Sequence, residues 1–332
     1  MPYVDTMIVD KLGNLIASKK GTRDGPVIML DAHMDEVGLM VKCVLPSGFI
    51  LFEQNGVIDD RVLLAEWVNI HTGKGTLTGT IGVKSRHLLT PQEASLPISS
   101  KDMWIDIGVE NDEQAIELGV RPGDPITFDR GFKVLADGKS ILARCLDDRV
   151  GCAIMVQSIK ELSNTQHEAT LYAVGSVQEE VGARGATTAA YQINPDLALV
   201  YDTGHSIDPA VTPKWSATMM GHGPTIRLMD ISQTGKGCIT PSALKELMIR
   251  AAEEETIPYQ LDLMAGTFLD SSTISLSRDG VPTINMCVAR RNAHSMSELC
   301  RFVDIENAVK LTVAFINRIT KEFADGFYQK LK

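Results

Sequence analysis

Residues 171–182, LYAVGSVQEEVG, decide the fold, because an apolar run there ends in two adjacent glutamates and a glycine. The run Leu171-Tyr172-Ala173-Val174 predicts a buried strand. Successive side chains at a strand end point in different directions, so Glu179 and Glu180 are expected to diverge. One carboxylate is then able to bind a metal ion while its neighbour transfers a proton.

The segments around this stretch alternate between strands and helices. This alternation is typical of an α/β layer architecture with a mixed, largely parallel sheet flanked by helices. Apolar residues at helical spacing predict the helices, and short apolar runs predict the strands. The predicted helices cover 149–162, 183–191, a segment opened by Thr240-Pro241, and 304–323, with strands at 27–30, 169–175 and 197–201.

The residue composition and pattern of the sequence change between residues 44 and 138. Short segments rich in β-branched residues are separated there by glycines, which is typical of a small β-barrel or sandwich. One short helix is expected at 112–119. We therefore predict a catalytic domain formed by 1–43 and 139–332, with an inserted β-rich domain at 44–138.

Composition excludes several classes of partner. The chain has 332 residues and a formal net charge of −10, so we expect no nucleic-acid partner and no anionic membrane partner. No apolar run reaches the roughly 18 residues of a membrane span, and the N-terminus lacks an export signal. Six cysteines without a C-x-x-C pair indicate reduced thiols. We predict a soluble, cytoplasmic chain.

Metal-binding side chains recur where predicted strands end. Open α/β sheets hold their ligands at the carboxyl ends of strands, so these side chains are expected to meet. Two imidazoles and three carboxylates suit zinc, cobalt or manganese. With Asp147 as a bridge, two metal ions each obtain three protein ligands. The candidate ligands are His33, Asp147, Glu180, Asp202 and His294.

A site with two metal ions has a defined chemistry. The ions lower the pKa of a bridging water and polarise a carbonyl group. A carboxylate that does not bind metal must accept the proton of that water, and Glu179 is the candidate general base. Asp35 lies two residues beyond His33, and we expect its carboxylate to accept the other N–H of that imidazole.

Each motif alone has an ordinary explanation. An Asp-Asp pair before a helix is usually an N-cap, and a Glu-Glu doublet usually lies on a solvated face. Asp202 is equally compatible with a turn. The metal interpretation is favoured because all the candidates occupy one kind of position, the end of a strand.

Four motifs resemble peptidase family 42 of the metallo class. They are DAHMDEVG (31–38), CLDDRVG (145–151), VQEEVGARGA (177–186) and AHSMSE (293–298). Residues 104–129 also resemble the inserted domain of this family, whose members are dinuclear aminopeptidases and include the tetrahedral TET enzymes. The resemblance implies a zinc-exopeptidase-like fold and an aminopeptidase that acts on short peptides.

The resemblance also implies individual roles. Asp147 would bridge the metals, Glu179 would be the base, and the Asp147–Asp148 bond would be cis. The inserted domain would mediate self-association, from a dimer to a dodecameric shell. The remaining ligands would divide into two sets, His33 with Asp202 and Glu180 with His294.

The chain departs from the family pattern near the expected substrate pocket. It reads GTFLDSS at 266–272 where Gly-Thr-Asp-Ala is usual, and ARRNAH at 289–294 where Pro-x-Arg-Tyr-x-His is common. Arg290 and Arg291 are compatible with an acidic substrate or with surface salt bridges to Glu298 or Glu306. His205 is compatible with a cleft or a turn, and His87 with a neighbouring subunit's site. Members of the family usually begin with one or two helices before the first strand, and we expect this chain to lack them.

Two other functions stay open at this point. Paired carboxylates also cleave glycosides, so a metal-independent carbohydrate hydrolase of the endoglucanase type is one alternative. A non-catalytic assembly protein that has kept the fold is the other.

Overall fold

The computed structural model describes residues 2–22 and 24–327. Its largest element is a nine-stranded mixed sheet. Its centre is parallel, because β3 pairs in parallel with β12 and β13, and β13 with β17. The strand order is β1(Thr6–Val9)-β2(Leu15–Lys19)-β12(Thr170–Ser176)-β3(Val27–His33)-β13(Leu197–His205)-β17(Thr283–Arg290)-β14(Thr225–Ile231)-β15(Gly237–Ile239), and β16(Gln260–Ala265) pairs with β14.

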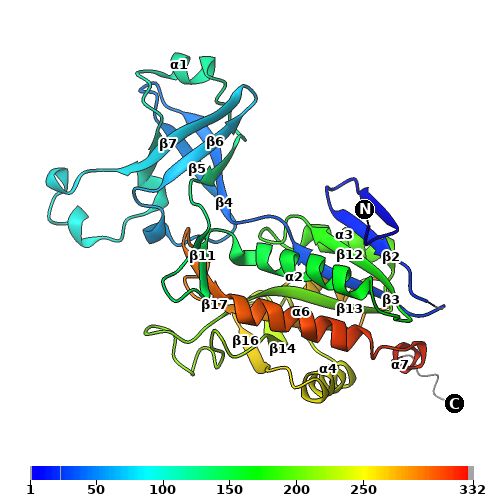
Figure 1. Ribbon diagram of the computed structural model, residues 1–332. Helices are drawn as coiled ribbons and strands as arrows, with labels where there is room; N and C mark the ends of the chain where they lie inside the picture. The colour runs from blue at the N-terminus through cyan, green and yellow to red at the C-terminus, as the bar shows by residue number, and fades with distance from the viewer. Residues whose placement is uncertain (1, 23, 328–332) are drawn as a thin grey trace.

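Helices cover both faces of this sheet (Figure 1). The main core cluster joins α2(Leu146–Leu162), α4(Ser242–Glu254) and α6(Phe302–Ile316) to one face. A smaller cluster joins α3(Arg184–Ile193) and α5(Ser271–Ile274) to the other. In α6, the buried residues 308, 311, 312 and 315 follow the spacing of one helical face.

A closed six-stranded barrel projects from the layered part of the molecule (Figure 1). Its strand order is β4(Gly38–Val44)-β5(Ile50–Asn55)-β8(Met103–Asp106)-β7(Gly75–Val83)-β6(Trp67–Thr72)-β9(Pro125–Phe128). The barrel has its own apolar core, which includes Leu39, Ile50, Ile70 and Ile105. It also carries a short helix, α1(Asp112–Glu117), and four 3-10 turns: η1(Asp60–Val62), η2(Arg86–Leu88), η3(Glu93–Ser95) and η4(Ser100–Asp102).

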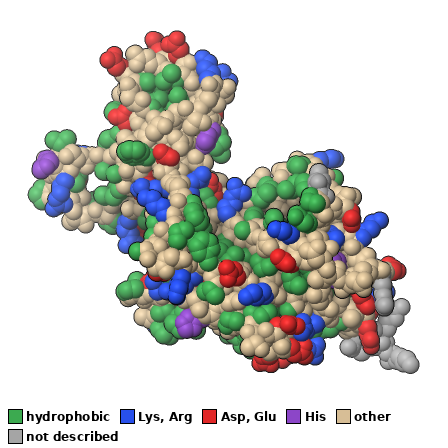
Figure 2. Space-filling model, in the orientation of Figure 1, with side chains coloured by type: hydrophobic (Ala, Val, Ile, Leu, Met, Phe, Trp, Pro, Cys, Tyr) green, Lys and Arg blue, Asp and Glu red, His purple; other side chains and the backbone are tan. Residues whose placement is uncertain are grey.

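The residues after β7 form an arm that extends sideways from the barrel (Figure 1). The arm, residues 84–102, contains η2, η3 and η4 and exposes Leu88, Leu96 and Ile98. Hydrophobic side chains are visible on it in Figure 2. A third, three-stranded sheet, β10(Lys133–Val134)-β11(Ser140–Ala143)-β18(Glu298–Arg301), lies at the base of the barrel (β11 is labelled there in Figure 1).

The expected fold class, an α/β sheet with an inserted barrel, is confirmed. Several boundaries differ from the prediction. The first barrel strand begins at Gly38, ahead of residue 44, because only four residues separate the end of β3 from the start of β4. The expected helix 304–323 is two helices, α6 and α7(Lys321–Asp325), since Thr320 caps a new helix by accepting from the N–H of Phe323. The division into a catalytic and an inserted domain stays a prediction.

Among the described residues, no helix is long and apolar enough to cross a membrane.

Candidate metal centre

The candidate ligands come from five separate places in the fold and converge on one cavity. His33 is the last residue of β3, and Asp147 lies in the first turn of α2. Glu180 lies in the loop after β12, and His294 in the loop after β17. Asp202 lies inside β13, which continues to His205, whereas the sequence placed it after the strand. All five line a cavity of about 410 Å³.

Two sets of three side chains each place one ligand atom within 4.8 Å of the others. We name His33, Asp147 and Asp202 the inner group, since all three are buried. Asp147, Glu180 and His294 form the outer group. Asp147 belongs to both groups, and the peptide bond that follows it is cis, as the resemblance implied. The structure therefore brings together every ligand that the sequence proposed.

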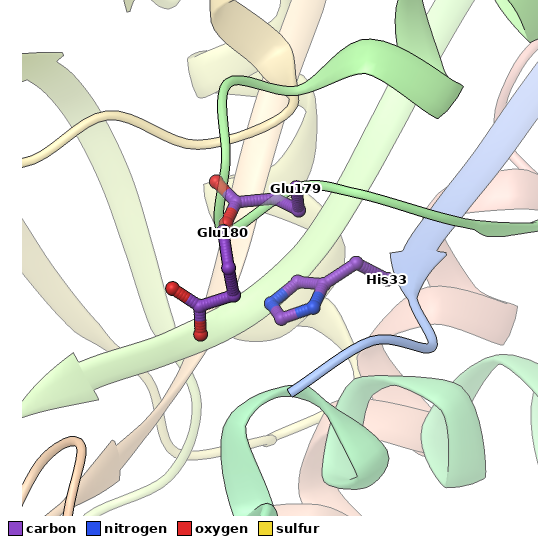
Figure 3. Close-up of side chains that lie close together, drawn as sticks. All are labelled: His33, Glu179 and Glu180. Atoms are coloured by element: carbon purple, nitrogen blue, oxygen red, sulfur yellow. The ribbon is translucent and has the colours of Figure 1, made fainter. Parts of the chain in front are cut away.

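The glutamate doublet lies next to His33 of the inner group. His33, Glu179 and Glu180 form a third set within the same 4.8 Å limit. Figure 3 shows the His33 ring at the end of β3 and both glutamates on the loop after β12, with their carboxylates apart from each other. The predicted divergence of the two side chains is thus present.

Asp147 presents its two oxygens to different histidines. Oδ1 lies 3.3 Å from Nε2 of His33, and Oδ2 lies 3.2 Å from Nε2 of His294. Within the described part of the chain, Asp147 Oδ1 and Glu180 Oε1 are buried without a hydrogen-bond partner. Buried carboxylate oxygens normally have partners. Zinc and cobalt ions bind carboxylate oxygens and imidazole nitrogens. The unpartnered oxygens and the two imidazoles beside them therefore fit a divalent metal ion.

Without a metal ion, the carboxyl groups of Glu179, Glu180 and Asp202 have raised pKa values. Burial, together with the charge of Asp147, raises the pKa of Glu180 to about 7 and that of Asp202 to about 8. Burial also raises the pKa of Glu179 well above its usual range. Although burial alone would lower the pKa of His294, its bond to Asp147 and the charge of Glu180 raise it to about 9. A bound cation reverses this balance and favours the ionised carboxylates.

Comparison with known proteins identifies the family. The M42 glutamyl aminopeptidase family model matches residues 13–311, most of the chain. The chain belongs to the M42 family. Among the relatives of this M42 chain is the lysyl aminopeptidase of Pyrococcus furiosus, which is 31% identical over 95% of this chain and 88% of its own length.

Solved structures agree with this M42 assignment. A TET aminopeptidase from the marine sediment archaeon Thaumarchaeota archaeon SCGC AB-539-E09 is 35% identical with a TM-score of 0.94, covering 98% of this chain and 90% of its own. The TET1 peptidase of Pyrococcus horikoshii, which assembles into a tetrahedron or a large octahedral shell, is 33% identical with a TM-score of 0.83, covering 95% and 90%. The expected enzyme class, a metallo-aminopeptidase that hydrolyses peptide bonds, is confirmed by these relatives.

In this M42 chain the backbone carbonyl of Asp35, and not its carboxylate as we expected, faces the second nitrogen of the His33 ring. The Nδ1 of His33 faces the backbone carbonyl oxygen of Asp35 at 3.1 Å, while the carboxylate Oδ1 is 3.7 Å away. The carboxylate instead accepts the backbone N–H of Glu179 at 3.0 Å and that of Glu180 at 3.2 Å. The turn after His33 brings the carbonyl to the imidazole and leaves the carboxylate free to orient the glutamate doublet.

Arg290 forms buried ion pairs, where the sequence had allowed a salt bridge at the surface. Only 5% of it is exposed, and its guanidinium donates to both Asp147 and Glu298 and, at 2.5 Å, to Oγ1 of Thr203. Although burial alone would raise the pKa of Asp147, the charge of Arg290, the hydrogen bond from His294 and the nearby charge of His33 hold it well below its usual range. The alternation of side chains along a strand could have predicted this burial. Residues 284, 286 and 288 of β17 face the main core, and Arg290 lies two positions further along the same side of the strand.

Glu298 is a further site residue, which the sequence offered only as a partner of Arg290 or Arg291 in a surface salt bridge. Its carboxylate accepts the backbone N–H of Asp147 at 3.0 Å and that of His294 at 2.9 Å, in addition to the bond from Arg290. It is 2% exposed. Glu298 therefore fixes the two ligand segments of the outer group relative to each other.

The two divergent segments form part of the cavity wall. Residues 266–269 line the cavity, while Asp270 is buried behind it and accepts a bond from the Ser176 hydroxyl at 2.7 Å. His205 also lines the cavity, and burial lowers its pKa to about 4, so its ring is neutral. Arg291 and His87 are exposed and lie outside the lining.

Proposed function

We propose that this M42 chain is a dinuclear metal-dependent aminopeptidase that removes N-terminal residues from short peptides. One observation carries the proposal. A single buried carboxylate, Asp147, belongs to two sets of metal-type ligands at the wall of a cavity that also contains Glu179. A shared carboxylate between two ligand sets is the arrangement that a two-metal hydrolase needs.

The inner group, His33, Asp147 and Asp202, would hold one divalent cation, and the outer group, Asp147, Glu180 and His294, the second. Zinc, cobalt and manganese suit this mixture of imidazole and carboxylate ligands. When bound, the two ions would supply an activated water and a Lewis acid for the scissile carbonyl.

Glu179 is proposed as the general base. It belongs to neither metal group, yet its side chain lies with His33 and Glu180 at the same cavity and is buried. The Asp35 carboxylate fixes its backbone. Its buried carboxylate would accept the proton of the attacking water and then deliver that proton to the leaving amine. Burial favours the neutral acid, which is the form that must donate in the second half of the reaction.

The cavity sets the size of the substrate residue. Its volume of about 410 Å³ lies at the lower end of the range for small-ligand sites, which suits one amino-acid side chain and the adjoining peptide bond. We propose that an acidic group of the cluster holds the free α-amine. The apolar residues Phe268 and Leu269, with His205, would then face the N-terminal side chain.

Glu179→Gln tests the assigned base. We expect kcat on aminoacyl-anilides to fall by about 10² to 10⁴ while the metal content stays that of the unmodified protein. The substrates are a panel of aminoacyl-anilides, each assayed with zinc, cobalt and manganese. Peptide hydrolysis that survives the substitution with the metals still bound would show that Glu179 is not the base.

Self-association through the inserted barrel is a second part of the proposal. The barrel and its arm expose large apolar side chains, among them Met40, Trp67, Leu88 and Leu96. Exposed apolar side chains of this size mark protein–protein contacts where they gather into one patch. The exposed residues suit contact with further copies of this chain, as in the TET1 relative. Light scattering would measure the mass, and Trp67→Glu with Leu88→Glu should lower it.

A cytoplasmic location stays a prediction from the sequence, which fractionation of cells that express the chain would check.

A further inference from the structure

The inner and outer groups share Asp147 through different oxygens. Oδ1 lies on the His33 side and accepts no hydrogen bond from any residue that the structure describes. Oδ2 lies on the His294 side and also accepts a hydrogen bond from Nη2 of Arg290. The shared carboxylate is therefore open toward the inner group and already occupied toward the outer group.

Arg290 is fixed in that position. Its Nη1 donates to Glu298, and its Nε donates to Thr203 Oγ1 at 2.5 Å. Glu298 is itself held by the backbone N–H groups of Asp147 and His294. If the guanidinium swung away, it would leave a buried carboxylate without its counter-charge, which is strongly unfavourable. Because a guanidinium does not lose its proton in proteins, this positive charge is permanent.

A permanent charge next to the outer group opposes a second cation there. Coulomb repulsion varies inversely with distance and is strong where the surroundings are buried. A cation at the outer group must also share Oδ2 with Arg290, whereas one at the inner group finds Oδ1 free. Arg227, the other arginine at the cavity, pairs with Asp262 at 3.3 Å. Its charge also acts on Asp202 of the inner group, but among the described residues no hydrogen bond joins it to an inner-group carboxylate, whereas Arg290 donates directly to Oδ2 of Asp147.

We infer that Arg290 makes the two metal sites unequal: the inner group binds its cation first and more tightly, and Arg290 lowers the affinity of the outer group. This inference rests on the proposed two-metal function. Arg290 acts here as a positioning residue, through Asp147 and through its charge. The chain would then hold one ion over a range of free metal concentration and require a higher concentration to hold both.

Titration of the metal-stripped chain with cobalt chloride tests this inference. Isothermal calorimetry gives the two affinities. The same titration of His33→Ala and of His294→Ala shows which ligand set accounts for each, because each variant lacks the imidazole of one group only. The unmodified chain should show two unequal binding events. In Arg290→Met the second affinity should rise by at least about tenfold while the first changes little.

Two further variants act as controls. Arg290→Lys keeps the positive charge and should keep the gap between the two affinities. Arg291→Met removes the same charge from the adjacent, exposed position and should leave both affinities as they are. If Arg290→Met does not fold, the double variant Arg290→Met with Glu298→Gln removes both members of the ion pair, and it is compared with Glu298→Gln alone.

The outcomes separate this inference from the proposed function. The role of Arg290 is overturned if Arg290→Met keeps the difference between the two metal affinities, or if the two affinities are equal in the unmodified chain. Either result leaves the two-metal function standing. One bound ion in the unmodified chain and two in Arg290→Met supports the inference in its strongest form. One ion in every variant overturns the two-metal function and the inference together.

Discussion

Glu298 accepts a hydrogen bond from the backbone N–H of Asp147 at 3.0 Å, although the two residues are 151 positions apart in the chain. The second oxygen of the same carboxylate accepts the N–H of His294 at 2.9 Å. A residue of the small sheet at the base of the barrel thus holds the first turn of α2 and the loop after β17 together. The geometry of the outer group depends on this one buried carboxylate.

Glu298→Gln should therefore weaken metal binding. The amide keeps the shape but offers one acceptor in place of two and leaves Arg290 with a single carboxylate partner. We expect metal affinity to fall about 10- to 100-fold, as is typical when a residue that orients metal ligands is changed. Competition with a chromophoric chelator measures this loss.

The matched control is Glu306→Gln, an exposed glutamate on α6 that makes the same chemical change. Its metal affinity should equal that of the unmodified chain. Equal affinities in Glu298→Gln and Glu306→Gln would show that the bonds from Glu298 do not support the metal ligands.

Asp35→Asn should lower activity without removing the metals. An amide cannot accept the N–H groups of Glu179 and Glu180 with two oxygens, so one of these N–H groups loses its acceptor. We expect kcat on aminoacyl-anilides to fall about 10- to 100-fold, with metal content retained. Metal analysis and steady-state kinetics on the same sample provide the measurement.

Asp137→Asn is the control for that change. Asp137 also accepts two backbone N–H groups, those of Lys139 and Ser140, but in the exposed turn between β10 and β11. Its kcat should not change. A loss of metal in Asp35→Asn would instead place Asp35 among the residues that hold the ions.

The parts of the site that follow from the sequence are those fixed by local pattern. Apolar runs locate β3, β12 and β13, and parallel strands bring the polar residues at their carboxyl ends to one edge. This reasoning is sufficient to bring together His33, Glu180, Asp202 and His294. Asp147 follows β11 of the separate antiparallel sheet, so parallel pairing does not place it. The barrel is likewise visible in the spacing of its short strands and glycines, although its first residue is not.

The parts that do not follow depend on contacts between distant segments. Arg290 is buried because Glu298 reaches it from β18, which is held in place by its pairing with β11. Asp35 contacts the glutamate doublet because of the direction of the turn after His33. Neither the burial of a charge nor the direction of a turn is contained in the hydrophobic pattern.

Gly151→Ala should destabilise the chain, although alanine is usually the better residue in a helix. In an ordinary helix this substitution gains about 1 kcal/mol. In α2, a Cβ at residue 151 would lie 2.2 Å from Oδ2 of Asp148, whose other oxygen accepts the N–H of Gly151 at 3.0 Å. We expect the free energy of unfolding to fall by about 1–3 kcal/mol, as for an overpacked core. Denaturant titration checks the sign, and a gain in stability would contradict the close contact.

Metal binding at the outer group should depend steeply on pH. In the metal-free chain the pKa of His294 is about 9, because its bonds to carboxylates outweigh burial, and the pKa of Glu180 is about 7, mainly through burial. Both side chains must lose their protons to bind metal. Between about pH 9 and about pH 7 one proton leaves with each ion bound, so the affinity should fall about tenfold per pH unit as the pH is lowered.

Below about pH 7 Glu180 is protonated as well, and the fall should approach about a hundredfold per pH unit. Calorimetry in buffers of different ionisation enthalpy counts the released protons directly. Asp147 does not contribute to this count, because Arg290 and the two histidines keep it ionised in the metal-free chain. An outer-group affinity that stays constant between about pH 9 and about pH 7 would contradict the expected loss of a proton from His294 on metal binding.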